Sequence, residues 1–459
     1  MSDTIRKLAR GLVGTTVIAL TASVLIAAPS VYPSGTTIYD PDRAWNGYTV
    51  LSPLGVQAAV VVDMNGRVVK RWEGFSNAAG GPSRVLPGGV VIAPVGTNPP
   101  RQEALALEQR NFDGDLIRRF DRNERIENAE GEMIWSSRQH HDWQRIDMPA
   151  GYYSPGVVPS GDDANMLLLT HTNHIVAAVA PDTVLEDDRI IEINMDGEIV
   201  WEWTAADHID EFGFDAEERR SIASATQFNA NRGSYDWMHI NSATWVGPNQ
   251  WYDAGDERFA PDNVIISSRQ SSVIAIIARD GSVVWQIGPD FSATPEESAI
   301  RQIIGQHHAH MIPVGLPGAG NIMIFDNGGS SGYGDPSPIA PDGMGIYARA
   351  TSRVLEIDPV TLELVWSYAA GNFFATNISG AQRLENGNTL ITEGPGGRIF
   401  EVTTEGDIVW EYIFPEYTGA RQTNSVYRAF RLPYDWIPQL EQPQETAVTP
   451  PGRAGFRVP

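Results

Sequence analysis

The sequence predicts an all-β protein, and more specifically a six-bladed β-propeller, on the strength of three observations. A short hairpin pattern recurs six times, and a second apolar pattern that opens with asparagine recurs between the hairpins. Helical periodicity is scarce, with residues 215–222 as one short candidate. Repeated all-β units of this kind are typical of four-stranded propeller blades.

The hairpins come first along the chain. Each joins alternating apolar residues to an acidic or glycine-containing turn and ends on an aromatic residue. Asp-Gly or Asn-Gly between alternating segments predicts a tight β-turn, and the closing aromatic residue is expected to pack between neighbouring sheets. The six copies lie at residues 62–72, 111–120, 193–201, 277–285, 357–366 and 402–410.

The second pattern has an asparagine, an apolar run and then polar residues that differ from copy to copy. It occupies residues 165–171, 263–269, 321–327 and 388–394. Variable polar residues after a fixed apolar strand indicate a repeated scaffold that carries a grafted site.

A third pattern lies just upstream and places His141, His239 and His307 at similar points of three successive repeats. Equivalent positions in a propeller are related by rotation about its central axis. We therefore expect these imidazoles to converge at the channel mouth, with Arg269 facing the same space.

The two ends of the chain differ from the repeats. Arg6, Lys7 and Arg10 precede an apolar run at residues 12–28 and then small residues, which is the order of an export signal. An uncleaved anchor is the alternative, because the run is close to the lower limit for a membrane span. Residues 1–30 are thus expected to be a signal peptide or anchor, which predicts a periplasmic or extracellular protein.

The remaining boundaries follow from composition. Residues 31–438 are expected to form the propeller, with only a reduced extension before the first hairpin. Residues 439–459 are a Pro-rich polar tail that we expect to be disordered. Membrane contact is expected only through an uncleaved N-terminal anchor.

Composition excludes several classes of function. A net charge of -24 disfavours nucleic acid as a partner, because phosphates would be repelled. The absence of cysteine removes disulfides, thiolate metal sites and a cysteine nucleophile.

Two kinds of chemistry fit three imidazoles and one guanidinium. The His308-x-His310 pair on a strand could ligate zinc or copper, with Asp142 or Asp326 completing the site. Alternatively, a neutral imidazole could accept an anionic group covalently, with Arg269 binding its oxygens. The arginine favours group transfer because it would repel a metal cation.

At these residues the chain resembles the bacterial arylsulfotransferases that do not use a nucleotide sulfate donor. The resemblance extends over about residues 45 to 430 and rests on motifs that occur in the family's order. These are His-His-Asp at 140–142, Asp-Trp-Met-His-Ile-Asn-Ser at 236–242, Ser-Ser-Arg at 267–269, Gln-His at 306–307 and Phe-Asp-Asn-Gly at 325–328.

The resemblance implies a six-bladed propeller and a ping-pong reaction from an aryl sulfate donor to a phenolic acceptor. His307 would be the sulfurylated nucleophile, His239 and Arg269 would hold the sulfuryl oxygens, and His141 would be the acid and base at the phenolic oxygen. The residues expected to contact substrate are His140, His308, Asn241 and Asn327. Neither a metal nor another cofactor is implied.

Several alternatives stay open at this point. The adjacent His307 and His308 leave the nucleophile uncertain by one residue. The short N-terminal stretch leaves open whether the protein is a homodimer, and an apparent insertion at residues 250–261 is expected to form a rim loop near the acceptor. The other functional classes are a metal- or quinone-dependent propeller oxidoreductase and a non-catalytic propeller scaffold for binding.

Overall fold

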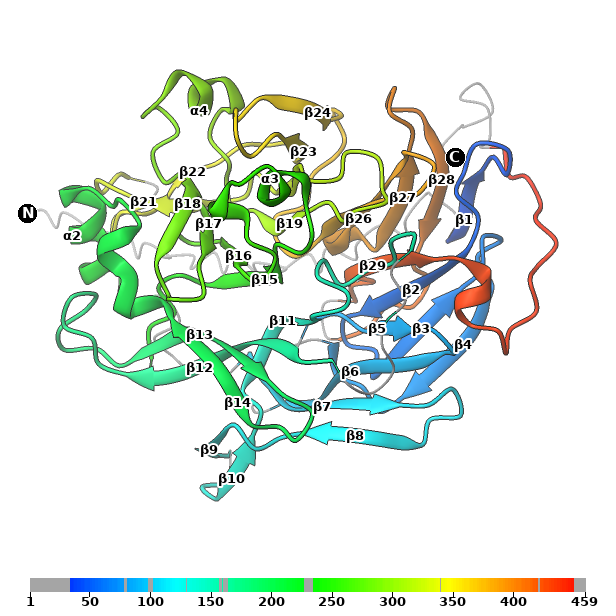
Figure 1. Cartoon of the computed structure of the whole chain (residues 1–459), viewed down its shortest axis with the longest axis horizontal. Coiled ribbons are helices and arrows are strands. Elements are labelled where there is room, and N and C mark those ends of the chain that lie inside the picture. Colours follow the sequence, from blue (N-terminus) through cyan, green and yellow to red (C-terminus); the bar gives the residue numbers. More distant parts are fainter. Residues whose placement is uncertain are drawn as a thin grey trace, which may run out of the picture. The chain divides into compact units, whose positions relative to one another are not determined.

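The sequence folds into an all-β, propeller-like structure, described here from a computed structural model (Figure 1). The structure describes residues 34–77, 81–97, 102–128, 130–156, 159, 164–226, 234–338, 340–419 and 422–449. The expected export segment at residues 1–30 lies outside these ranges. Within them, no helix is long and apolar enough to cross a membrane.

Three sheets contain the four-stranded units that the repeats predict, with every neighbouring pair of strands antiparallel. One sheet joins β15 (Ile240–Trp245), β16 (Val264–Ser268), β17 (Val273–Ile277) and β18 (Val283–Ile287). Another joins β19 (His307–Met311), β20 (Ile322–Asp326), β23 (Arg353–Ile357) and β24 (Leu364–Tyr368). In the third, β29 (Val426–Leu432) pairs with β2 (Tyr48–Pro53), followed by β3 (Ala58–Val62) and β4 (Val68–Glu73) (Figure 1).

A fourth sheet has five strands because an N-terminal strand adds to its outer edge. Its order is β25 (Gly380–Arg383), β26 (Thr389–Glu393), β27 (Arg398–Val402), β28 (Ile408–Ile413) and β1 (Gly35–Tyr39). The short stretch before the first hairpin therefore extends the repeat sheets.

The largest sheet has eight strands and consists of two consecutive four-stranded runs. The first contains β5 (Arg84–Leu86), β6 (Val90–Thr97), β7 (Ala104–Arg110) and β8 (Leu116–Phe120). The second contains β11 (Gln139–Arg145), β12 (Met166–His174), β13 (Leu185–Ile193) and β14 (Ile199–Thr204). One residue pair, Gln139 with Ala104, joins the two runs.

Two small hairpins complete the described strands, β9 (Glu124–Glu127) with β10 (Met133–Ser136) and β21 (Ser331–Tyr333) with β22 (Met344–Tyr347). The predicted helix at residues 215–222 is present as α2 (Ala216–Ser224), which Asp215 caps. The other short helices are η1 (Ala205–Glu211), α3 (Gln250–Asp253), η3 (Glu257–Phe259), α4 (Pro295–Ile300), η4 (Gly394–Gly396) and η5 (Tyr434–Trp436).

Five of the six hairpins close on a tryptophan whose indole N–H donates to the turn of the next hairpin, whereas the second closes on Phe120. The Trp72 indole donates to the carbonyl oxygen of Phe112 at 2.9 Å, in the turn of the following hairpin. The same bond recurs from Trp201 to Arg279, from Trp285 to Pro359 and from Trp366 to Thr404. The Trp410 indole donates to the carbonyl oxygen of Met64 at 2.9 Å, so the last hairpin is bonded to the first.

Two expectations about the edges of the domain are wrong. The segment at residues 250–261 connects the C-terminal end of β15 to the N-terminal end of β16, whereas His239 directly precedes β15 and Arg269 directly follows β16. The segment therefore lies at the opposite end of this strand pair from His239 and Arg269 and cannot shape a site at those residues. It is also partly helical, and Trp251 donates to the carbonyl oxygen of Gly320 at 2.8 Å. The tail is ordered through residue 449, because Val448 forms a β-bridge with Tyr39. Residues 450–459 lie outside the described ranges.

A buried ion network joins the first strands of several sheets. Asp142 on β11 accepts from Arg84 on β5 at 2.9 Å and from Arg428 on β29 at 3.0 Å. Arg428 also donates to the carbonyl oxygen of Asn241 on β15 at 2.8 Å. The strands β5, β11, β15 and β29 are therefore joined through charged groups that are almost fully buried. The polar motifs identified in the sequence lie on or beside strands of this kind.

Candidate active site

His141 and His239 lie together, each held by an unusual backbone conformation. Their φ angles are +52° and +50°, in the left-handed region that non-glycine residues seldom adopt. The ladder between β11 and β12 is irregular around His141, and His239 directly precedes β15. The two ring centroids are 4.7 Å apart at 74°, and both side chains are partly exposed.

His307 lies deeper, with 2 % of its surface exposed. Its Nδ1 is 2.8 Å from Oδ1 of Asn327 and 3.1 Å from the carbonyl oxygen of Gly305. Both of these oxygens are acceptors, so Nδ1 carries the proton. Nε2 then accepts from the backbone N–H of Ile378 at 3.1 Å.

The electrostatics hold His307 and His141 neutral. Burial lowers the pKa of His307 well below its ordinary value, and the positive charge of Arg269 lowers it further. Burial likewise lowers the pKa of His141, with His239 as the next cause and His307 among the others. These mutual effects place the three predicted histidines and Arg269 in one electrostatic group.

The three histidines nevertheless do not share one register position. His307 opens β19 and pairs with Phe325, whereas His239 stands before the first paired residue of β15. His141 lies within β11, inside the irregular part of its ladder. The irregularities differ between the sheets, and the rings that they bring into contact are those of His141 and His239.

Arg269 follows β16, and its backbone N–H donates to the carbonyl oxygen of His239 at 3.1 Å. Its guanidinium has no hydrogen bond or ion pair with any side chain in the described ranges. Burial lowers the pKa of Arg269, and Asp236 acts in the opposite direction. An arginine without a fixed partner is suited to bind an anion with its fork of donors.

Asp236 also belongs to the candidate site, although its sequence motif alone predicted no role for it. Its Oδ2 lies 2.5 Å from Nδ1 of His239, so the carboxylate orients that imidazole and leaves Nε2 to face the site. An aspartate three residues before a histidine was visible in the sequence, but only the turn between them brings the two groups into contact.

Tyr427 on β29 also joins the site. Its hydroxyl donates to the carbonyl oxygen of His141 at 2.9 Å, and the two ring centroids are 6.2 Å apart. Burial raises the pKa of Tyr427 above its ordinary value, so the phenol stays protonated.

The predicted substrate contacts have different positions. Asn327 orients His307, as described above, and its amide nitrogen donates to the carbonyl oxygens of Ala375 and Ile378 at 2.9 and 3.1 Å. Asn241 is fully buried and donates to the carbonyl oxygen of Gln306 at 2.7 Å. Both asparagines therefore support the backbone or side chain of the histidine segment.

His308 and His140 lie away from the exposed side of the group. The ring of His308 is 4.3 Å from that of His310 and 5.8 Å from that of Phe430, beneath the site, because successive side chains on a strand point in opposite directions. His140 lies behind His141, with 2.8 Å between their Nδ1 atoms, and stacks on His171.

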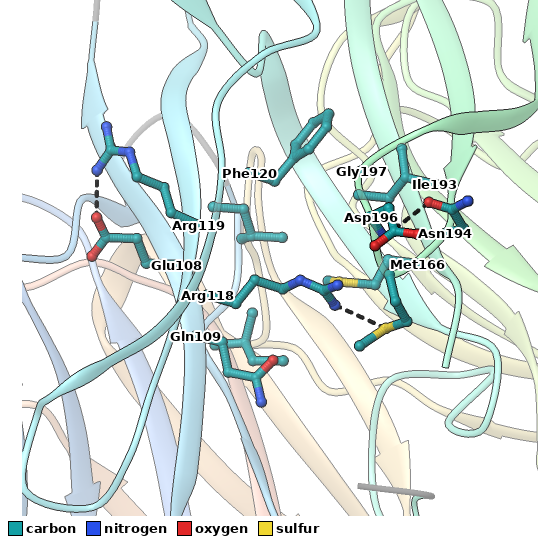
Figure 2. A pocket seen from close by; sticks show the side chains of 13 residues that line it. Glu108, Gln109, Arg118, Arg119, Phe120, Met166, Ile193, Asn194, Asp196 and Gly197 are labelled. Atoms are coloured by element: carbon teal, nitrogen blue, oxygen red, sulfur yellow. Dashed lines mark hydrogen bonds and ion pairs between the residues drawn. The ribbon is translucent and has the colours of Figure 1, made fainter. Parts of the chain in front are cut away.

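A separate pocket lies away from the three histidines and Arg269. It has a volume of about 100 Å³ and lies among β7, β8, β12 and the turn at residues 194–197, with no histidine in its lining. Figure 2 shows Arg119 paired with Glu108 at its edge. The candidate active site is therefore formed by the three histidines and Arg269, not by this pocket.

Comparison with known families agrees with the geometry. The model of the arylsulfotransferase (ASST) family matches residues 145–411, more than half of the chain. The chain belongs to the arylsulfotransferase family. The matched region includes His239, Arg269 and His307, whereas His140 and His141 precede it.

Other comparisons add little about function. No curated protein sequence matches the chain. A solved protein of unknown function from Bacteroides caccae is 9 % identical over 84 % of this arylsulfotransferase-family chain and 98 % of its own, with a TM-score of 0.44. A streptogramin B lyase is 13 % identical over 86 % of both chains, with a TM-score of 0.37. Neither likeness carries a functional argument.

Proposed function

We propose that this arylsulfotransferase-family protein moves a sulfuryl group from an aryl sulfate to a phenol through a sulfohistidine at His307. The supporting observation is a buried neutral imidazole whose Nδ1–H is fixed by Asn327, close enough to the positive charge of Arg269 for that charge to lower its pKa. Such an imidazole is a competent nucleophile at neutral pH. No nucleotide sulfate donor, metal or other cofactor enters this scheme.

In the first step, Nε2 of His307 attacks the sulfur of the donor. An N–S bond forms, the S–O bond to the aryl group breaks, and the aryl group leaves as a phenolate that takes its proton from solvent. The bond from the Ile378 N–H to Nε2 is given up, and that N–H becomes free to donate to a sulfuryl oxygen. Arg269 binds the same oxygens, and Nδ1–H keeps its bonds to Asn327 and Gly305.

In the second step, a phenol replaces the released product. An ordinary phenol has a pKa of about 10, so it needs a general base at neutral pH. His239, held by Asp236, or His141, which is neutral, takes the phenolic proton. The phenolate oxygen attacks sulfur, the N–S bond breaks, and the electron pair returns to Nε2.

The test uses 4-nitrophenyl sulfate with and without a phenol acceptor. Without acceptor, one equivalent of nitrophenol per chain should be released in a burst, and peptide mass spectrometry should find one SO3 group on His307. With acceptor, turnover should continue. His307→Ala should lower the rate at least about 10³-fold.

His208→Ala is the matched control, because His208 is paired with Glu211 and lies outside the imidazole group. It should keep both the burst and the turnover. A label on His308, or full activity in His307→Ala, would contradict the assignment of the nucleophile.

Two further properties belong to this proposal. We infer six blades, because the eight-stranded sheet divides into two four-stranded runs and tryptophan contacts lead from five of the six hairpins to the next one. We also infer an exported, periplasmic or extracellular enzyme from the charged, apolar and small-residue order of residues 6–30.

A further inference from the structure

Behind His141, a second group of side chains has the composition of a metal site. His140 on β11, His171 on β12 and Asp188 on β13 come from three neighbouring strands of one sheet, and His171 pairs in register with Asp188. All three are buried, with at most 2 % of their surface exposed. None has a role in the sulfuryl transfer proposed above.

The potential ligand atoms are at suitable distances. Nε2 of His140 lies 3.3 Å from Oδ1 of Asp188, and Nε2 of His171 lies 3.9 Å from the same oxygen. All three residues can offer one ligand atom within 4.8 Å of the others. In a tetrahedral site with bonds of about 2.1 Å, neighbouring ligand atoms are roughly 3.4 Å apart.

Two of these atoms are buried without a hydrogen-bond partner. Within the described part of the chain, Nε2 of His140 and Oδ1 of Asp188 make no hydrogen bond of good geometry, although they lie 3.3 Å apart and the other oxygen of Asp188 accepts from the N–H of Ile240 at 2.9 Å. A buried lone pair without a donor costs about 1–3 kcal/mol. A metal ion bound between these two atoms would satisfy both of them.

The opposite sides of both rings are engaged, as in known metal sites. Nδ1 of His171 lies 3.1 Å from Oε1 of Glu103, and Nδ1 of His140 lies 2.8 Å from Nδ1 of His141. Metal-bound imidazoles commonly donate their second N–H to a carboxylate or another acceptor, which fixes the tautomer and ring orientation. Nε2 is thereby left as the ligand atom of each ring.

Several carboxylates lie beside the proposed ligands and share one arginine. Glu103, Glu186 and Asp188 are buried together, and Oε1 of Glu186 lies 3.4 Å from Nδ1 of His171. Arg138 pairs with Glu103 at 2.6 Å but also with Glu124 at 2.7 Å. One guanidinium therefore serves several carboxylates, and a divalent cation bound here would offset the repulsion among them.

We propose that His140, His171 and Asp188 bind one divalent transition-metal ion of the zinc type. Two imidazoles and a carboxylate suit zinc, whereas calcium and magnesium prefer all-oxygen sites. The two rings stack at 3.6 Å and 12°, so binding spreads them to aim both Nε2 atoms at one ion. The site does not depend on the sulfuryl-transfer proposal.

Metal binding would position a residue of the proposed reaction. With Nε2 on the ion, Nδ1 of His140 carries a proton and donates it to Nδ1 of His141. His141 then holds its own proton on Nε2. This consequence alone rests on the proposed function.

The experiment measures metal on the full-length protein. Elemental analysis of protein purified without chelators should find about one equivalent of zinc or a similar metal per chain. After chelation and dialysis, titration with ZnCl2 should show one site, and zinc at 100 times Kd should raise Tm by about 3 °C for a chain of this length. His171→Gln and Asp188→Asn should each weaken zinc binding at least about 10-fold.

His174→Gln is the matched control. His174 lies on the same strand and pairs with Asp187 at 2.8 Å, outside the three ligands, so zinc binding should be unchanged. Chelated wild-type protein that neither binds zinc nor gains Tm overturns the proposal, whether or not the variants fold. Binding of undiminished affinity in both ligand variants also overturns it.

Discussion

Replacing Asp142 by asparagine is expected to destabilise the protein more than any replacement of a surface carboxylate. The Asp142 side chain is fully buried between Arg84 at 2.9 Å and Arg428 at 3.0 Å, and it joins strands β5, β11 and β29. Asparagine keeps the shape but loses the charge, and its NH2 group would face one of the two guanidiniums. Two buried cations would then repel each other without a counter-ion.

The magnitude follows from burial. Breaking a buried ion pair by removing one partner typically costs about 3–5 kcal/mol. An unfolding entropy of about 2.1 cal/mol/K per residue amounts to roughly 1 kcal/mol/K for this chain, so Tm should fall by about 3–5 °C. Asp407→Asn is the matched control, because its pair with Arg43 at 2.7 Å is exposed and should contribute at most about 1 kcal/mol.

Scanning calorimetry at one scan rate and neutral pH measures both variants against the wild type. The nitrophenyl sulfate assay should also detect Asp142→Asn, because Asp142 directly follows His141 and Arg428 supports the backbone at Asn241. Equal Tm values for the Asp142 and Asp407 variants would refute the reasoning that burial makes this carboxylate indispensable.

Three more predictions concern the same inner strands. The pKa of His310 is lowered to about 4, mainly by burial, so the unfolded chain gains a proton near pH 6.5 before the folded chain does and stability falls as the pH falls. From about pH 7.5 to about pH 5 this costs about 2 kcal/mol, and His310→Gln should lose that much less in denaturant unfolding; an unchanged pH dependence would contradict the assignment. Asn327→Ala removes the nearer of the two acceptors of His307 Nδ1, so the nitrophenol burst should slow about 10–100-fold in stopped flow, whereas an unaltered burst would argue against an orienting role for Asn327. Arg269→Lys replaces a fork of donors by a point charge and should lower kcat/KM about 10²-fold or more, while Arg258→Lys, whose partner is Asp256, should leave it unchanged; equal losses would argue against a specific anion site.

Many of the strands could be predicted because residues that are close in the sequence specify them. The turn in each hairpin is specified by neighbouring residues, so Asn65-Gly66 joins β3 to β4 where the sequence predicts it. The closing tryptophans were also visible, and their contacts between sheets follow from the repeat. The expected disorder of the tail was wrong for residues 439–449, because low hydrophobicity does not reveal that Val448 can add to an edge strand.

The site was less accessible to sequence reasoning. Spacing grouped His141, His239 and His307, but the contact between the rings of His141 and His239 depends on left-handed backbone angles that the spacing does not encode. Asp236 and Tyr427 reach the group from a turn and from the last strand of the domain. The insertion at residues 250–261 was assigned to the wrong end because strand direction fixes its place.

The sequence by itself determined the repeated hairpins, the family and the residues that concentrate titratable chemistry, because these are properties of neighbours along the chain. Only the tertiary structure decided that His307 is fixed by Asn327 and His239 by Asp236, and that His308 faces the core. The tertiary structure also brings His140, His171 and Asp188 together in one buried cluster. Ring orientation, proton position and burial arise from contacts between distant strands, which no local pattern specifies.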